Sequence, residues 1–333
     1  MNSSIESLLK NPIPLDPAQV SGWKEVIIND CHESLVPIDS YTGYKRIAKD
    51  AIYFGECETS PYYPYGLNGS LLTPFVRIGL AEKLREAQKL LPSGHLFLIW
   101  DAYRPIQVQA ALFDFIIAEL TKEKPNLSEA ERFEEAQRFV SLPSIDPLKP
   151  SPHNTGGVVD LTIIKVSAPL WEEIQALEYF SDDSLDKIQE YNKRKSQIIR
   201  GQGKLLDMGT PFDSVGTETE SNYYERLAMK KSLTLNEQNR LLNRRLLHNA
   251  LSSVGMRNYP EEWWHFSYGD QMWAKQIDCL AIYGAITLSA DNINFESKQQ
   301  LIYQQEVAKA QTKGISSDWT DPRRSSHTRA VQI

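Results

Sequence analysis

The sequence has few of the features that mark disulfide-bonded, membrane-spanning or nucleic-acid-binding proteins. Its three cysteines are far apart among 333 residues and form no CxxC pair, which argues against a disulfide framework and a cysteine metal site. No apolar run reaches the roughly 18 residues of a membrane span. Residues 1–20 lack the basic and apolar segments of a secretory signal. The net charge of −7 gives no sign of a nucleic-acid-binding face.

Nucleotide-binding motifs are missing as well, because the chain contains neither GxGxxG nor GxxxxGK[ST]. Hydrophobic residues make up 41% of the chain, enough for a substantial core. We therefore expect a cytoplasmic enzyme that acts on a small molecule, without nucleic acid or membrane as a partner and with homo-oligomerisation left open.

Hydrophobic periodicity predicts an α+β fold with a small, mostly antiparallel sheet flanked by helices. Thr73 and Pro74 suit the start of one helix, and Thr234 with Glu237 forms a capping box for another. The expected helices span 73–91, 106–121, 234–253, 270–288 and 295–311, and the expected strands span 96–100 and 158–164. The predicted organisation is a lead-in over 1–30, a domain over 31–312 with a helical insertion at about 166–205, and a polar tail over 313–333.

The segment from Ser151 to Asp160 (SPHNTGGVVD) combines a loop histidine, a glycine pair and an aspartate within an apolar strand. An ionised carboxylate in such a strand is costly to bury without a partner. Asp160 is either a hydrogen-bonded structural residue or a metal ligand, since a dication offsets the desolvation of a carboxylate. A histidine such as His153, taken alone, is more often a loop or surface residue than a metal ligand.

A second unusual segment is Glu262-Trp263-Trp264-His265. The tryptophans fit a core strand, but a glutamate beside them does not, whereas a water-excluding wall around Glu and His suits a metal site. Together His153, Asp160 and His265 would give zinc three ligands and leave a fourth position for water. Glu262 and His265 share a face on a helix but not on a strand, so a bulge, kink or turn must bring both to the metal.

Four motifs occur in an order that resembles the D-alanyl-D-alanine dipeptidases, the vancomycin-resistance-type zinc peptidases related to D,D- and L,D-carboxypeptidases. In chain order, the motifs are DAYRP (101–105), SPHNTGGVVD (151–160), MGTPFD (208–213) and EWWH (262–265). Together they span about half of the chain. The stretch between Asp160 and Met208 is longer than in compact family members.

The resemblance implies a role for each matching residue. His153, Asp160 and His265 would bind Zn²⁺, and Glu262 would act as the general base. Arg104 would stabilise the oxyanion that forms on the scissile carbonyl of the substrate. Asp213 would hold the ammonium group of the substrate, and Ser151 and Asn154 would line the pocket.

Some of these roles have plainer alternatives. Arg104 could form a structural salt bridge to Asp101, and Asp213 could be a turn or cap residue. The resemblance also implies a pocket tyrosine, for which Tyr44 is the candidate.

Other functions remain open at this point. A D,D- or L,D-carboxypeptidase would trim longer wall peptides, a hydrolase of specialised metabolism would use a pocket reshaped by the insertion, and a silent relative would bind zinc and recognise a peptide without cleaving it. Glu262 separates the last from the others, since a silent relative does not need the base. Another divalent ion could also replace zinc, because ligand type constrains the metal only loosely.

Overall fold

One mixed sheet, with strands from distant parts of the chain, forms the centre of the molecule. The computed structural model describes residues 3–38, 47–56, 60–63, 65–137, 140–176 and 202–312. The strands follow the order β2-β4-β5-β8-β7, with β6 also pairing to β5, and only β2 and β4 run parallel. The strands are β2 (Ile47–Lys49), β4 (His95–Asp101), β5 (Val158–Lys165), β6 (Lys204–Leu205), β7 (Arg257–Asn258) and β8 (His265–Ser267), and a separate pair is β1 (Leu35–Pro37) with β3 (Phe75–Arg77). The expected small, mostly antiparallel sheet is confirmed.

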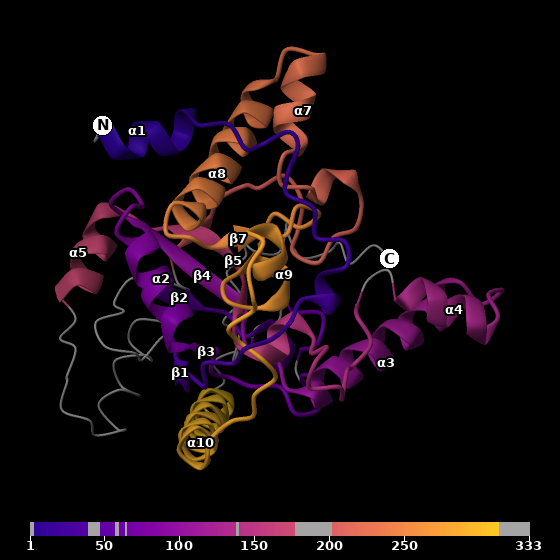
Figure 1. Ribbon diagram of the computed structural model, residues 1–333. Coiled ribbons are helices and arrows are strands. Elements are labelled where there is room, and N and C mark those ends of the chain that lie inside the picture. Colours follow the sequence, from indigo (N-terminus) through magenta and orange to yellow (C-terminus); the bar gives the residue numbers. More distant parts are fainter. Residues whose placement is uncertain are drawn as a thin grey trace.

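Helices flank this sheet, and Figure 1 shows α3 and α4 extending away from it. The α-helices are α1 (Ser3–Lys10), α2 (Ile78–Gln88), α3 (Ile106–Glu123), α4 (Glu129–Ala136), α5 (Ala168–Ala176), α7 (Tyr223–Lys230), α8 (Leu235–Ser252), α9 (Gln271–Gln276) and α10 (Ala290–Thr312). Short 3-10 turns are η1 (Trp23–Glu25), η2 (Ile52–Phe54), η3 (Pro152–Thr155) and η4 (Thr217–Thr219). No helix in the described parts of the chain is both long and apolar enough to cross a bilayer.

The central strand β5 is covered on both faces. Leu161 and Ile163 pack into a core that also holds Leu247 of α8, whereas Ile164 packs with Trp171 of α5. A strand buried on both sides needs apolar residues at most positions, which explains why Val158, Val159, Leu161, Ile163 and Ile164 are all apolar. The predicted strand over 158–164 is confirmed, as are the strand over 96–100 and the helices over 106–121 and 234–253.

The helix predicted from residue 73 begins later, because the chain first forms β3. Phe75–Arg77 pairs antiparallel with Leu35–Pro37, and α2 starts only at Ile78. Backbone pairing with β1 and burial of Phe75 outweigh the local cap signal at Thr73. That part of the prediction was wrong.

The helix predicted over 270–288 is also much shorter, since α9 ends at Gln276. Asp278 takes a positive φ of 54°, which a continuing right-handed helix cannot contain. Beyond it the backbone of Ala281 exchanges hydrogen bonds with Ile27 and Asn29. These bonds to an N-terminal segment replace the helical ones.

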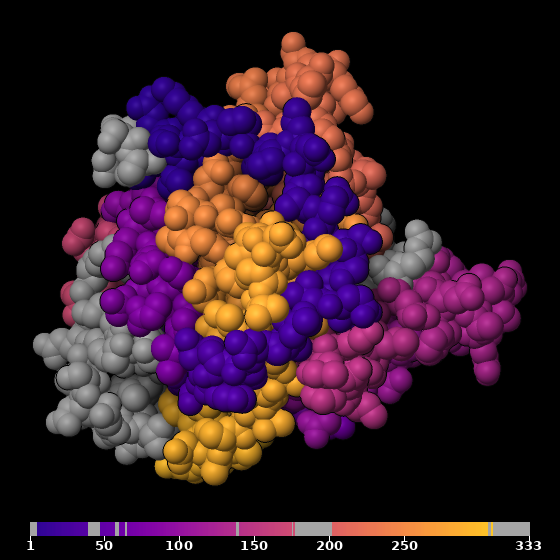
Figure 2. Space-filling model, in the orientation of Figure 1, coloured from indigo at the N-terminus to yellow at the C-terminus, as the bar shows by residue number. Residues whose placement is uncertain are grey.

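The N-terminal segment lies against the C-terminal half of the chain, as Figure 2 shows by colour. The amide of Asn249 on α8 donates to the carbonyl of Leu8 at 2.7 Å, and that of Gln271 on α9 donates to Val26 at 2.6 Å. Polar side chains of α8 and α9 thus donate hydrogen bonds to backbone carbonyls of the N-terminal segment, most of which is irregular. Most of the predicted insertion (177–201) and the predicted tail (313–333) lie outside the described residues.

Candidate metal centre and active site

Strand register places three of the site residues side by side. Asp160 on β5 pairs directly with Asp101 on β4 and with His265 on β8. Directly paired residues of antiparallel strands point to the same face of a sheet. A register shift between Ile99 and Asp101 is needed for this, because regular alternation would put Asp101 on the same face as Ile99.

His153 reaches the same face from the turn η3. Its Nδ1 lies 2.8 Å from the carbonyl oxygen of Ala102 and 3.0 Å from Oδ2 of Asp101, so Nε2 is turned to Asp160 at 3.3 Å. The turn ends at Gly156, whose φ of 70° lies in the left-handed region that strains residues with a side chain. This glycine lets the chain leave the turn that carries His153 and enter β5.

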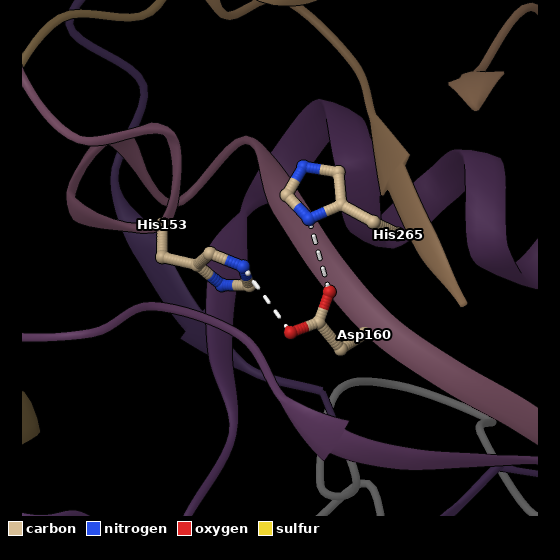
Figure 3. A group of neighbouring side chains, drawn as sticks. All are labelled: His153, Asp160 and His265. Atoms are coloured by element: carbon tan, nitrogen blue, oxygen red, sulfur yellow. Dashed lines mark ion pairs between the residues drawn. The ribbon is translucent and has the colours of Figure 1, made fainter. Parts of the chain in front are cut away.

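Two imidazoles face one carboxylate in this cluster (Figure 3). His265 Nδ1 lies 3.1 Å from Oδ1 of Asp160, and one ligand atom each from His153, Asp160 and His265 lies within 4.8 Å of the others. All three side chains are buried, with exposures of 5%, 3% and 6% respectively. Such a spacing suits a single cation held by two nitrogens and one oxygen.

The electrostatics of the cluster fit a cation. Oδ1 of Asp160 is buried and faces Nδ1 of His265 at 3.1 Å. Burial would raise the pKa of Asp160, but His153 and His265 hold it well below its usual range. Burial would lower the pKa of His153, yet Asp160 and Asp101 raise it to about 10. The buried carboxylates thus favour a positive charge at this position, which a bound metal ion would supply.

Glu262 and His265 meet through a turn, which resolves the spacing conflict noted in the sequence. The Glu262 amide donates to Tyr259, the His265 amide donates to the Glu262 carbonyl, and β8 begins only at His265. Oε2 of Glu262 lies 3.6 Å from His265 Nδ1 and 36% of its side chain is exposed. Burial raises the pKa of Glu262, and the nearby His265 opposes that rise. A partly exposed carboxylate at this position can exchange protons with water.

Arg104 lies next to this cluster and is almost fully hydrogen-bonded. Both Nε and Nη2 donate to Oδ2 of Asp101, at 2.9 and 2.6 Å. Nη1 donates to Gln109 at 2.8 Å, and Nη2 also donates to the hydroxyl of Tyr53 at 3.1 Å. Nη2 is 3.9 Å from Asp160. The salt bridge to Asp101 considered from the sequence is therefore present, and it holds the guanidinium beside the metal-ligand cluster.

Asp213 joins the site through Tyr53. The Tyr53 hydroxyl donates to Oδ2 of Asp213 at 3.3 Å, and Asp213 has a positive φ of 57°. Burial, together with Asp160 and Glu262, raises the pKa of Asp213 to about 8. The turn conformation considered from the sequence is correct, and it directs the carboxylate to an acidic region that a substrate ammonium group would neutralise.

The other two predicted pocket residues belong to the turn that carries His153. Asn154 is buried and its side-chain amide donates to the carbonyl of Arg104 at 3.2 Å. Ser151 is also buried, and its backbone carbonyl accepts a hydrogen bond from the backbone N–H of Asn154. Through its side-chain amide, Asn154 connects η3 to the loop after β4 that contains Arg104. Contact of either residue with a substrate stays a prediction.

An aromatic wall connects the MGTPFD and EWWH segments. The indole of Trp263 donates to Thr210 at 2.8 Å, and the ring centroid of Phe212 lies 5.5 Å from that of Trp264. From α8, the buried side chain of Arg244 donates to the carbonyl of Met208 at 2.8 Å. These contacts hold Asp213 and Glu262 on neighbouring loops. The tryptophans act as core residues and as the support of the site.

Sequence reasoning missed Tyr53 and Gln109, and it treated Asp101 only as a salt-bridge partner. No motif surrounds Tyr53, and its link to Arg104 depends on the fold. Tyr44, the tyrosine that the sequence suggested, lies outside the described residues. A small hollow is lined by Tyr53, Asp101 and Arg104, and the three metal-ligand candidates do not line it.

Comparisons with known proteins identify similar peptidases. The family model described as D-ala-D-ala dipeptidase matches residues 194–282, which include Asp213, Glu262 and His265. A D-alanyl-D-alanine dipeptidase of Synechocystis is 28% identical over 281 residues, 79% of this chain and 91% of the relative. One of Enterococcus faecalis is 22% identical over 211 residues, 63% of this chain and 79% of the relative. The chain thus resembles the D-alanyl-D-alanine dipeptidases over most of its length, and this resemblance supports a peptidase.

Proposed function

We propose that the protein is a zinc-dependent dipeptidase that hydrolyses D-alanyl-D-alanine or a similarly small dipeptide. The observation that carries the proposal is the meeting of His153, Asp160 and His265 within 4.8 Å, with Glu262 3.6 Å from one of them. When bound there, Zn²⁺ would polarise the scissile carbonyl and acidify the attacking water. The named relatives supply the candidate substrate.

The side chains around the cluster divide the remaining work. Glu262 takes a proton from the attacking water and delivers it to the leaving amine. Arg104 donates to the oxyanion that develops on the scissile carbonyl, an interaction worth about 3 kcal/mol in comparable sites. Asp213 binds the ammonium group of the dipeptide, while Ser151 and Asn154 line the pocket.

Charge explains why a free dipeptide suits this site. A zwitterionic dipeptide offers few atoms for recognition, so its ammonium group and the charge that develops on its scissile carbonyl must each meet a group of opposite charge. Asp213 and Arg104 lie on the two sides of the Tyr53 hydroxyl, at 3.3 and 3.1 Å from it. This spacing places a cation and a carboxyl group, which an arriving ammonium group would ionise, within the length of one dipeptide. Cytoplasmic location and homo-oligomerisation stay predictions from the sequence.

A substrate panel tests the proposal. D-Ala-D-Ala, D-Ala-D-lactate, L-Ala-L-Ala and a cell-wall pentapeptide are each incubated with purified protein, with and without chelator. We expect cleavage of D-Ala-D-Ala that chelator abolishes and zinc restores. Cleavage of the pentapeptide alone would instead assign a carboxypeptidase, and chelator-insensitive cleavage would remove the metal mechanism.

The variant Glu262→Gln separates catalysis from metal binding. It should keep its zinc, measured by elemental analysis, and lose hydrolysis by about 100-fold or more, because the amide cannot accept the proton. Normal turnover in this variant would refute the general-base assignment. Absence of cleavage in both wild type and variant, with zinc bound, would point to a silent zinc-binding protein.

A further inference from the structure

The side chain of Gln109 lies between the site and the helix pair α3 and α4. It lies in the first turn of α3 and is only 3% exposed. Its Oε1 accepts from Nη1 of Arg104 at 2.8 Å, and its Nε2 donates to the carbonyl of Ser141 at 2.5 Å. Both ends of the amide are therefore used, one by the site and one by the segment that follows α4.

The contacts of Arg104 explain why such an anchor matters. Both hydrogen bonds to Asp101 end on the same oxygen, Oδ2, so that carboxylate holds the guanidinium at one point. A planar group held at one point can still swing about it. The Tyr53 hydroxyl gives a further contact, but it also donates to Asp213, so that contact would change when an ammonium group reaches Asp213. Gln109 is the partner of Nη1 on the remaining side.

We infer that Gln109 is a positioning residue, which fixes the plane of the Arg104 guanidinium for donation to the oxyanion. This inference rests on the proposed function, because the oxyanion role of Arg104 belongs to it. Donors aimed at developing charge act only when their direction is fixed in advance. A misplacement of about 1 Å can reduce turnover by about 100-fold. Gln109 contacts no metal-ligand candidate, so its effect should fall on turnover and not on metal binding.

Matched variants separate positioning from a merely structural role. Gln109→Met keeps the volume and loses the acceptor, whereas Gln109→Glu keeps an acceptor for Nη1. Gln88 on α2 is the control, because it is 5% exposed and also makes one donor and one acceptor bond, to His95 and Phe97. Gln88→Met therefore removes an equally buried amide away from the site.

Steady-state kinetics with D-Ala-D-Ala give the expected pattern. In the Gln109→Met variant kcat should fall about 10- to 100-fold, with KM within about threefold and zinc content unchanged. The Gln109→Glu variant should keep kcat within about fivefold of wild type, and Gln88→Met should keep kcat while losing comparable thermal stability. Unchanged kcat in Gln109→Met, or an equal fall in Gln109→Glu, overturns the inference.

A second readout does not depend on activity. In nitrogen-15 spectra the Nη1 protons of Arg104, assigned by their loss in Arg104→Lys, should be resolved in wild type because Gln109 restricts rotation. They should merge in Gln109→Met. Resolved protons in both proteins would overturn the inference. An inactive wild type that shows the expected spectral change would refute the proposed function alone and leave the anchoring of Arg104 standing.

Discussion

Substitution of Asp101 by asparagine should weaken both metal binding and folding, since one oxygen of this buried carboxylate supports two parts of the site. Oδ2 lies 3.0 Å from His153 Nδ1 and 2.6 Å from Arg104 Nη2. Burial would raise the pKa of Asp101, but Arg104 and His153 keep it below its usual value, so the group is an anion at neutral pH. Asparagine keeps the shape and removes the charge.

The size of each effect follows from these contacts. Groups that orient a metal-binding histidine typically contribute 10- to 100-fold in affinity, so the Asp101→Asn variant should bind zinc about 10- to 100-fold more weakly. Removal of one partner from a buried ion pair costs about 3 to 5 kcal/mol. Because the amide can still accept from Arg104, we expect the free energy of unfolding to fall by about 3 kcal/mol.

Two measurements check this prediction. Zinc affinity is measured by competition with a chromophoric chelator, and the free energy of unfolding is measured by urea denaturation of the metal-free protein. Glu225→Gln is the matched control, because Glu225 is buried and bound by Arg245 through two bonds of 2.6 Å. It should lose comparable stability and keep its zinc affinity. Zinc affinity within twofold of wild type in a folded Asp101→Asn variant would refute the reasoning.

Three further predictions follow from burial. His265→Ala should lose stoichiometric zinc in elemental analysis, and retention of one zinc per chain would exclude His265 as a ligand. Burial raises the pKa of Asp270 from 3.8 to about 6, so wild type should lose stability as pH rises from about 4 to 6. The variant Asp270→Asn can still cap α9 but does not titrate. Relative to wild type, its free energy of unfolding should therefore be about 3 kcal/mol higher at pH 7.5 than at pH 4, measured by urea titration with chelator present. A difference from wild type that does not change with pH would contradict this prediction. Leu247→Ala, in the core at 1% exposure, should cost about 2 to 5 kcal/mol in unfolding without changing zinc affinity, and a smaller loss would mean that the core collapses around the cavity.

Much of the fold could be predicted where one local pattern decides the structure. The helix α8 begins after the Thr234–Glu237 capping box, and both of its reciprocal hydrogen bonds are present. The short, β-branched segment over 158–164 predicted a strand, and β5 is there. By contrast, α2 and α9 were predicted too long, because pairing with β1 and a turn at Asp278 come from other parts of the chain.

The clustering of His153, Asp160 and His265 could be predicted from the sequence, and the geometry of the site less so. Asp160 stood out because a carboxylate in an apolar strand needs a partner, whereas His153 was singled out mainly by the family resemblance. The turn between Glu262 and His265 could only be stated as a requirement. Tyr53 and Gln109 gave no sequence signal, because both reach Arg104 through the tertiary fold.

The register of β5 against its two neighbours has a consequence for how the protein matures. Asp101, Asp160 and His265 form one row across three strands, so a slip of β5 by a single residue would turn Asp160 to the opposite face. A chain with such a slip could not bring Asp160 to His153 and His265. Under the proposed function, a metal ion captured during folding would therefore be held only by chains with native pairing, and an excess of that ion would enrich them by mass action.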